Sequence, residues 1–297
     1  MKHDIGTVLT AMVTPFDERG ELDLAEAGRL AQWLVERGNE GLIVAGSTGE
    51  GQTLSHSERL ALIEAVKNAV SDRATVVANT GSNDTRDSVA ATAAAQDSGA
   101  DAILAVVPYY NKPTQKGMLA HFGAIARATR LPIVVYNIPG RTAANMLPET
   151  LLELAARHEN IAGVKESSGD LKQIATILAQ RSPDVGVWAG DDHLFLPCLA
   201  MGADGIVGVA SHLCSREYGE MIDAYRNGDV ARAAQIHLEL MPLFDALFAT
   251  TNPIPVKWAM RQLDFNVGEC RLPLDQLPKA NAERLRPLVE RYAYAAR

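Results

Sequence analysis

The first residue that could do chemistry is a lysine at the end of an apolar segment. Residues 161–164 have the composition of a short buried strand, and Lys165 follows them before any turn residue. Burial of a charged amine costs free energy unless the amine is paired or loses its proton. A neutral lysine amine attacks a ketone or aldehyde and forms a Schiff base. The alternative is a lysine whose stem is packed while its ammonium group reaches water.

Hydroxyl groups stand at the ends of two other apolar runs. Tyr136 ends the run 132–137, and a phenol beside the lysine can act as a general acid or base. Ser47 and Thr48 follow the run 41–46 in the segment GSTGEG. Two hydroxyls beside glycine-flanked N–H groups form a cradle suited to a carboxylate. An ordinary core or turn role stays the alternative for each of these residues.

Two more loops carry groups suited to a small anionic substrate. Arg141, in the segment PGRT, can hold a carboxylate through two parallel hydrogen bonds, or can pair with an acid at the surface. Tyr109 and Tyr110 are adjacent, so their side chains diverge and at most one points into a given site. Exposed tyrosines also suit an interface between subunits.

The adjacent carboxylates of Asp191 and Asp192 suggest a metal pair at first. No third carboxylate or histidine has a fitting spacing, and the segment opens a predicted helix. Aspartates at that place bind backbone N–H groups and complement the helix dipole. We therefore interpret both as helix caps, interpret His193 and His212 as structural, and predict no metal site.

Eight short apolar runs alternate with segments of helical period. The runs are apolar nearly throughout, as parallel strands buried on both faces are. They are 7–13, 41–46, 75–79, 101–107, 132–137, 160–165, 185–190 and 204–210. Eight such units over about 225 residues predict an α/β fold of the (β/α)8 TIM-barrel type. An open doubly wound sheet is disfavoured because no Gly-rich fingerprint follows the first run.

The segment after the second run shows how the helices are recognised. Ser55 and Glu58 have the spacing of a capping box at its start. The apolar residues of the segment then fall on one face, namely Leu62, Val66 and Val70. Beyond residue 225 the pattern is purely helical, so we expect a catalytic barrel over 1–225 and a C-terminal helical region over 226–297. The candidate residues above lie at the ends of predicted strands or directly after them, where a barrel of this type has its active site.

Length, charge and cysteine content restrict the class of protein. The 297 residues carry 28 basic and 36 acidic side chains, and the net charge of −8 argues against nucleic acid and anionic membranes as partners. No apolar run approaches the ~20 residues of a membrane span, and the first residues lack a signal-peptide pattern. The three cysteines are too far apart for a disulfide framework or a zinc site. We expect a cytoplasmic protein.

Seven segments of the chain follow one another in a recognisable order: VTPF, GSTGE, PYYNKPTQ, VYNIPGRT, GVKESSGD, GDD and NPIPVKWA. Together they resemble the dihydrodipicolinate synthase / N-acetylneuraminate lyase family of class I aldolases, over essentially the whole chain. The arginine of YNIPGRT, with PYYNKPTQ and NPIPVKWA, looks most like the synthases of the family. The resemblance implies a lyase that condenses pyruvate with L-aspartate 4-semialdehyde in lysine and diaminopimelate biosynthesis.

The resemblance also implies a role for each candidate. Lys165 would form the Schiff base with pyruvate, and Tyr136 would be the general acid and base. Ser47 would relay protons between Tyr136 and Tyr110, with Tyr110 reaching in from a neighbouring subunit. The family is usually a homotetramer built as a dimer of dimers. It needs no metal or organic cofactor, because the lysine itself carries the electrophile.

Four further residues would bind substrate or line the pocket of such an enzyme. Thr48 would help to hold the pyruvate carboxylate, and Arg141 would receive the carboxylate of the aldehyde. Gly190 and Val207 would line the pocket.

One departure from the family pattern bears on the second substrate. The synthases usually read GTTGES where this chain reads GSTGEG, so Ser47 keeps the hydroxyl but loses a methyl group. The sialic-acid lyases also read GSTGE, whereas Arg141 favours the synthases because those lyases have no short carboxylate aldehyde to grip. The first alternative is therefore an aldolase or dehydratase of N-acetylneuraminate or 2-keto-3-deoxy sugar acids. The second is a non-catalytic member of the family that binds a ligand.

Another departure bears on regulation. In lysine-sensitive bacterial relatives the allosteric pocket includes a serine and a histidine where this chain has Gly51 and Arg59, and usually a glutamate where it has Asp87. Three other residues match that pocket, namely His56, Asn83 and Tyr109. We therefore predict weak or absent inhibition by lysine.

Overall fold

Eight parallel strands of the described chain close into a barrel. The structure is a computed structural model that describes residues 4–293. Each strand is hydrogen-bonded to the next in sequence order, and β8 returns to β1, so the predicted (β/α)8 barrel is confirmed. The strands are β1 (Val8–Ala11), β2 (Gly41–Val44), β3 (Thr75–Asn79), β4 (Ala102–Val106), β5 (Ile133–Asn137), β6 (Ile161–Glu166), β7 (Gly186–Ala189) and β8 (Gly205–Gly208). Each lies within its predicted run, except that β6 extends one residue further.

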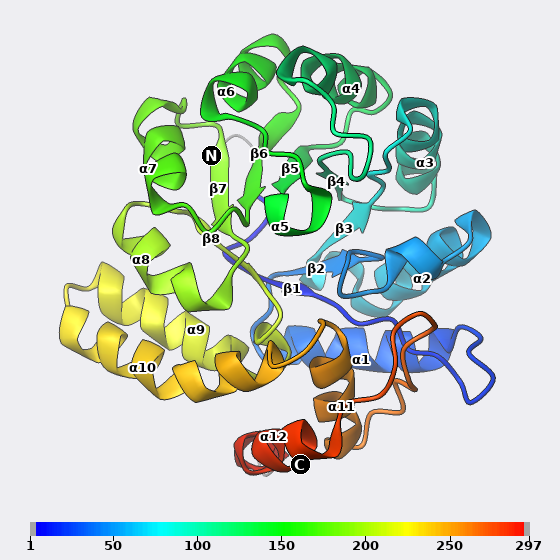
Figure 1. Cartoon of the computed structure of the whole chain (residues 1–297), viewed down its shortest axis with the longest axis vertical. Coiled ribbons are helices and arrows are strands. Elements are labelled where there is room, and N and C mark those ends of the chain that lie inside the picture. Colours follow the sequence, from blue (N-terminus) through cyan, green and yellow to red (C-terminus); the bar gives the residue numbers. More distant parts are fainter. Residues whose placement is uncertain (1–3, 294–297) are drawn as a thin grey trace.

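Helices surround the strands (Figure 1). They are α1 (Leu24–Glu36), α2 (His56–Val70), α3 (Thr85–Asp97), α4 (Gln115–Arg127), α6 (Pro148–Arg157), α7 (Leu171–Gln180), α8 (Phe195–Ala200) and α9 (Ser211–Arg226). The short helix α5 (Pro139–Thr142) follows β5 and is drawn inside this ring, in front of the strands. It carries Arg141, so one of the candidate residues lies over the barrel rather than on its outer face.

Helix α2 shows why these segments fold as predicted. Ser55 Oγ accepts a hydrogen bond from the Glu58 N–H at 3.2 Å, and the Glu58 carboxylate accepts one from the Ser55 N–H at 2.7 Å. The predicted capping box is therefore confirmed. The predicted apolar face is buried, namely Leu62, Val66 and Val70. Because the cap comes shortly after the segment of Ser47 and Thr48, it fixes the far end of that loop.

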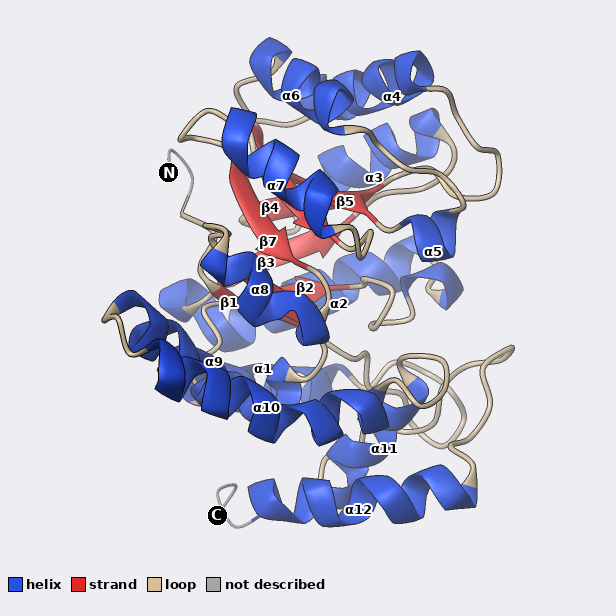
Figure 2. Cartoon of the chain, turned by 60° about the vertical axis from the view of Figure 1, so that its left-hand side comes forward, coloured by secondary structure: helices blue, strands red, loops and turns tan. Residues whose placement is uncertain are grey.

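Three helices follow the barrel units: α10 (Val230–Leu247), α11 (Ile254–Gln262) and α12 (Lys279–Ala293). Figure 2 shows α10 lying along α9, with α11 and α12 farther from the strands. The segment between α11 and α12 returns to the barrel, where the Phe16 N–H donates to the Val267 carbonyl at 3.1 Å. The last predicted helical segment ran to residue 295, and its residues 294 and 295 lie outside the described chain. The division at residue 225 stays a prediction.

The interior of the barrel is filled by side chains. An inner cluster of buried apolar residues comes from strands all around it: Ile5, Leu9, Ala11, Ile43, Val77, Ala102, Leu104, Val134, Tyr136, Ala162, Trp188 and Val207. A larger cluster lies between the strands and the helices. Because the interior is packed, substrates have access only at the ends of the strands. Within residues 4–293, no helix has the length and apolar character needed to cross a membrane.

Candidate active site

A one-residue shift in β6 places Lys165 beside Tyr136. Ile133 is opposite Ile161, but the next residue of β5, Val134, is opposite Gly163, so Ala162 is left over as a bulge. With the first register maintained, Lys165 would be opposite Asn137. The extra residue instead brings Lys165 opposite Tyr136, as the order of the predicted strands indicated.

The Lys165 side chain is buried without a counter-charge. Only 5% of the residue is exposed, and Nζ lies 4.2 Å from the centroid of the Tyr136 ring. Tyr136 is itself 5% exposed. Within residues 4–293, Lys165 has no ion-pair partner. The surface-reaching alternative for this lysine is therefore not what the structure shows.

Gly190, directly after β7, gives the lysine its space. A Cβ atom there would lie 3.0 Å from Lys165 Cε and 1.8 Å from Ser167 Oγ. The Ser167 hydroxyl is buried and has no hydrogen-bond partner in the described chain. Sequence reasoning did not single out Ser167, although its position two residues after Lys165 puts it on the same side of an extended strand. Val207 of β8 belongs to the inner cluster with Tyr136.

A cavity of about 310 Å³ contains a second group of candidate residues. It is lined by Ser47, Gly51, Gln52, Arg59, Asn79, Gly81, Val106, Tyr109, Ile138, Arg141 and Thr142. Lys165 and Tyr136 do not line it. The structure thus brings the predicted residues together in two groups, one buried around Lys165 and one around the cavity.

Asn252 connects the two predicted carboxylate-binding residues. Its side-chain amide donates to Thr48 Oγ1 at 2.9 Å, and its backbone carbonyl accepts from Arg141 Nη2 at 3.1 Å. Asn252 belongs to the segment NPIPVKWA, in which no local sequence pattern predicts a role for this residue. It precedes α11, so the region after the barrel contributes to the site.

The loop of Ser47 and Thr48 ends on a buried ion pair. Glu50 has a left-handed backbone (φ 52°), and its carboxylate accepts a hydrogen bond from Lys257 Nζ at 2.8 Å. Both side chains are 1% exposed. Lys257 also donates to the Glu269 carbonyl at 2.9 Å and lies 4.3 Å from the centre of the Phe16 ring. Burial lowers the pKa of Lys257, and the charge of Glu50 opposes that shift.

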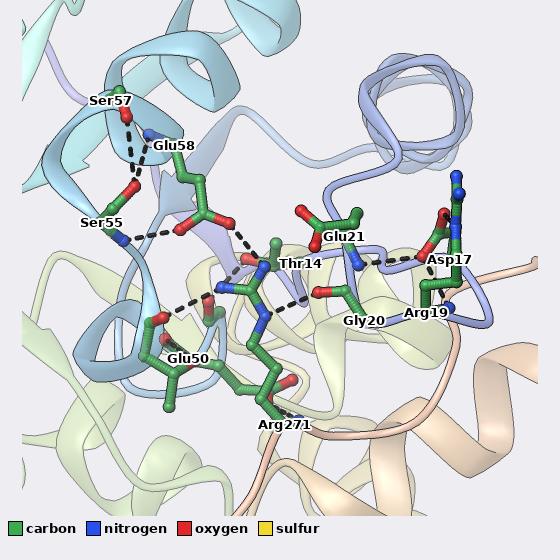
Figure 3. Close-up of polar contacts among 12 residues, drawn as sticks. Thr14, Asp17, Arg19, Gly20, Glu21, Glu50, Ser55, Ser57, Glu58 and Arg271 are labelled. Carbon is green, nitrogen blue, oxygen red and sulfur yellow. Dashed lines mark hydrogen bonds and ion pairs between the residues drawn. The ribbon is translucent and has the colours of Figure 1, made fainter.

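Arg271 holds the same loop from the other side (Figure 3). Its N–H donates to the second Glu50 carboxylate oxygen at 2.8 Å, and its guanidinium donates to the Thr53 carbonyl at 3.0 Å and to the Gly20 carbonyl at 2.8 Å. The guanidinium also pairs with Glu58, and this pairing lowers the pKa of that carboxyl to about 2. Lys257 and Arg271 therefore fix the loop from segments that follow the barrel.

The remaining predicted residues lie apart from these groups. Tyr110 is 88% exposed and has a positive φ of 74°, and it does not line the cavity. His56 and Asn83 do not line it either, and the Asn83 carbonyl accepts from Asn111 Nδ2 at 2.8 Å. Among the residues weighed for regulation, Tyr109, Gly51 and Arg59 do line the cavity.

The two adjacent aspartates behave differently. Asp191 accepts from the His193 N–H at 3.0 Å and so caps the short turn Asp192–Leu194. The interpretation of Asp192 as a cap is wrong. Its buried carboxylate instead accepts from Tyr218 Oη at 2.6 Å and from two N–H groups after β8, because the side chain turns toward that loop. Burial raises its pKa. No group of residues within 4–293 has the composition and spacing to hold a metal ion.

His212 is structural, as interpreted. Its Nε2 accepts from the Val13 N–H at 3.1 Å, and its Nδ1 lies 2.8 Å from the Val209 carbonyl, so the ring is neutral with the proton on Nδ1. Burial lowers its pKa to about 4.

Comparison with known proteins agrees with this geometry. Residues 4–292 match the model of the dihydrodipicolinate synthetase family. The chain is 48% identical over 288 residues to a 4-hydroxy-tetrahydrodipicolinate synthase of Thermosynechococcus vestitus, covering 97% of each chain. A solved structure of DHDPS from Cyanidioschyzon merolae with lysine bound superposes with a TM-score of 0.96 at 45% identity, covering 99% of both chains.

A chloride-inhibited dihydrodipicolinate synthase from Acinetobacter baumannii, solved in complex with pyruvate, superposes with a TM-score of 0.92 at 34% identity. It covers 98% of this chain and 99% of its own. A family match over nearly all of the sequence, relatives near half identity and the same barrel lead to one conclusion. The chain belongs to the dihydrodipicolinate synthetase family.

Proposed function

We propose that this chain condenses pyruvate with L-aspartate 4-semialdehyde, the reaction of the 4-hydroxy-tetrahydrodipicolinate synthases that it resembles. The observation that carries the proposal is Lys165, which is 5% exposed, lacks an ion-pair partner within residues 4–293 and lies against Tyr136. A buried amine of this kind suits covalent capture of a keto acid. The relatives' name and the pyruvate bound in one neighbouring structure support the choice of substrates.

The proposed chemistry begins with attack of Lys165 Nζ on the carbonyl carbon of pyruvate. The carbonyl oxygen leaves as water after protonation, and an iminium ion remains. The iminium draws electrons from the neighbouring methyl carbon, which loses a proton and becomes an enamine nucleophile. That carbon attacks the aldehyde carbon of the semialdehyde, and the aldehyde oxygen takes up a proton. The amine of the semialdehyde then attacks the imine carbon, closes the ring and releases the lysine.

The other residues of the site take the remaining tasks in this proposal. Tyr136 transfers protons beside the amine, and Ser47 passes them on toward Tyr110 of a neighbouring subunit. Thr48 holds the pyruvate carboxylate, and Arg141 binds that of the semialdehyde. The hydrogen bonds of Asn252 to both Thr48 and Arg141 support this division, because one residue contacts both carboxylate-binding groups, Thr48 through its side chain and Arg141 through its backbone carbonyl.

Reduction with borohydride tests the covalent step. The protein is incubated with pyruvate and borohydride, and the intact mass and peptide map are recorded. We expect one reduced pyruvate on Lys165, and none in K165A. Absence of an adduct from the unaltered protein would refute both the synthase proposal and the sugar-acid alternative, since both need the same imine.

A substrate panel tests the second substrate. We expect turnover of aspartate semialdehyde and little turnover of N-acetylmannosamine. In R141A, kcat/KM for the semialdehyde should fall about 10- to 100-fold, because a charge-assisted carboxylate contact is removed. R86A is the matched control, since the Arg86 side chain is 95% exposed. Unchanged turnover in R141A, or preferential turnover of N-acetylmannosamine, would instead support the lyase branch.

We also propose a homotetramer. The exposure of Tyr110, at 88%, supports it, because a large aromatic side chain exposed to this degree suits an interface with another subunit. Sedimentation and light scattering of the unaltered protein and of Y110A measure the mass of the assembly. A monomer that turns over both substrates at full rate would overturn this part. Weak inhibition by lysine and a cytoplasmic location also stay predictions.

A further inference from the structure

A buried carboxylate directly follows the lysine that is proposed to form the Schiff base. Glu166 is 2% exposed, and its side chain lies on the opposite face of β6 from that of Lys165, because successive side chains of a strand alternate. No lysine, arginine or histidine within residues 4–293 forms an ion pair with Glu166. A buried charge without a counter-charge has to be matched by hydrogen-bond donors.

Three donor groups contact the Glu166 carboxylate. The Asn137 side-chain amide donates to both oxygens, at 3.2 and 3.0 Å, and the Ser168 N–H donates to Oε1 at 2.8 Å. The side-chain amide of Gln173, on α7, donates to Oε2 at 3.2 Å. Burial raises the pKa of Glu166, and these hydrogen bonds oppose that rise. Both oxygens accept hydrogen bonds, as those of an ionised carboxylate do.

A backbone group fixes the direction of these hydrogen bonds. The Met146 N–H donates to Asn137 Oδ1 at 3.0 Å, so the amide nitrogen of Asn137 has to face Glu166. The same nitrogen donates to Asn145 Oδ1 at 2.8 Å, and Asn145 Nδ2 donates to Gln173 Oε1 at 2.8 Å. Gln173 therefore turns its own nitrogen toward the carboxylate. Every amide that contacts residue 166 presents a donor, which only an acceptor at both oxygens can match.

The contact between Asn137 and Glu166 exists in only one register of β5 and β6. In the bulged register these two residues are opposite each other, one position beyond the pair of Tyr136 and Lys165. Without the bulge, Lys165 would be opposite Asn137, the last residue of β5, and Glu166 would have no residue of β5 opposite it. A shift by one residue also turns every side chain of a strand to the other face. The contact therefore favours the register that brings the lysine beside the tyrosine.

We propose that Glu166 and Asn137 form a positioning pair for the capture of pyruvate. The pair holds the ends of β5 and β6 in the register in which Lys165 Nζ lies against the Tyr136 ring. Both side chains act from the far face of their strands, so neither touches the substrate. This role rests on the proposed function, because Lys165 is the amine that would form the imine. Proton transfer beside that imine depends on placement, and a displacement of about 1 Å costs about 100-fold in rate.

Exchange of the methyl protons of pyruvate in deuterium oxide measures this step without the second substrate. The imine loses a methyl proton to the protein, and the resulting enamine takes up a deuteron, which NMR detects as loss of the methyl signal. The limiting exchange rate at saturating pyruvate should fall about 10- to 100-fold in E166Q and in N137D, because two donors or two acceptors then face each other. The KM for pyruvate should change little. E64Q is the matched control, since Glu64 is exposed on α2, and it should leave the exchange rate unchanged.

The double variant N137D/E166Q separates positioning from general damage. In it the carboxylate and the amide change places, and the Met146 N–H keeps its acceptor. The amides of Asn145 and Gln173 can then both turn over, so that each donor of the network again meets an acceptor. We expect the limiting exchange rate to recover about tenfold or more relative to E166Q.

Circular dichroism and urea unfolding show which variants are folded under the assay conditions. Full exchange in folded E166Q would overturn the inference alone, because the carboxylate would then only stabilise the fold. If E166Q does not fold, the double variant decides. A double variant that is unfolded, or that exchanges at less than about a tenth of the unaltered rate, would overturn the inference as well. Absence of exchange in the unaltered protein would overturn the proposed function together with this role.

Discussion

The buried pair of Lys257 and Glu50 predicts a large loss of stability when one partner is removed. In K257M the apolar stem of the side chain is kept and its ammonium is lost. The Glu50 carboxylate, at 1% side-chain exposure, then keeps only the Arg271 N–H as a donor, and the Glu269 carbonyl loses its donor as well. Breaking a buried ion pair in this way costs about 3–5 kcal/mol. That is a large part of a typical unfolding free energy of about 5–15 kcal/mol.

Urea unfolding followed by circular dichroism measures this loss. K172M is the matched control, because Lys172 is exposed on α7. We expect K172M to unfold within about 0.5 kcal/mol of the unaltered protein. The double variant E50Q/K257M should be more stable than K257M alone, since the buried carboxylate no longer has a charge to desolvate. A coupling of about 0.5–3 kcal/mol is expected for groups in direct contact.

The same variants test whether the pair positions the site. Because Glu50 ends the loop of Ser47 and Thr48, K257M should slow formation of the borohydride adduct under conditions in which it is still folded. The reasoning is refuted if K257M is as stable as K172M. It is also refuted if E50Q/K257M is no more stable than K257M, because the unpaired carboxylate would then not be the source of the loss.

Three further outcomes follow from the geometry. In G190A the new methyl group would lie 3.0 Å from the Lys165 stem and 1.8 Å from the Ser167 hydroxyl. The rate of borohydride trapping should therefore fall in G190A and recover in part in G190A/S167A. An unaffected rate in G190A would contradict the placement of Gly190. The pKa of His212 is lowered by burial to about 4 from 6.5, so the unfolded chain takes up the proton first and stability should fall as pH drops from 6.5 to 4. The loss is about 3 kcal/mol in total. If the unfolding free energy of H212Q falls as steeply between pH 6.5 and 4 as that of the unaltered protein, His212 is not the source of the loss. The arginine partner of Glu58 lowers the pKa of that carboxyl to about 2 from 4.5. The stabilisation by Glu58 is therefore present above pH 4.5 and lost as pH falls toward 2. In acid unfolding, the stability of E58Q should depend less on pH than that of the unaltered protein.

The barrel and the buried lysine were predictable because both depend on patterns of neighbouring residues in the sequence. Runs of apolar residues mark strands buried on both faces, and the order of the strands in the chain is their order around the barrel. Lys165 ends such a run, and Tyr136 lies next to the end of the run before it. Their neighbourhood therefore followed from chain order alone, although the bulge at Ala162 that sets the register had no visible signal.

The contacts that hold the site loop were not predictable, because they join distant segments. Lys257 and Glu50 are 207 residues apart, and Asn252 and Thr48 are 204 apart. No periodicity or capping pattern connects such positions. The interpretation of Asp192 failed for a similar reason, since a cap and a tertiary acceptor look alike in sequence and only the position of Tyr218 separates them.

The late position of Lys257 and Arg271 has a consequence for how the protein is made. All eight strands have left the ribosome once residue 208 has emerged, yet Glu50 still lacks its buried counter-charge until residue 257 and its second donor until residue 271 have followed. During synthesis the chain thus passes through a stage at which every strand is available but the Glu50 carboxylate lacks both of its hydrogen-bond donors. The loop of Ser47 and Thr48 therefore reaches its final set of contacts only after the segments that follow the barrel have been made.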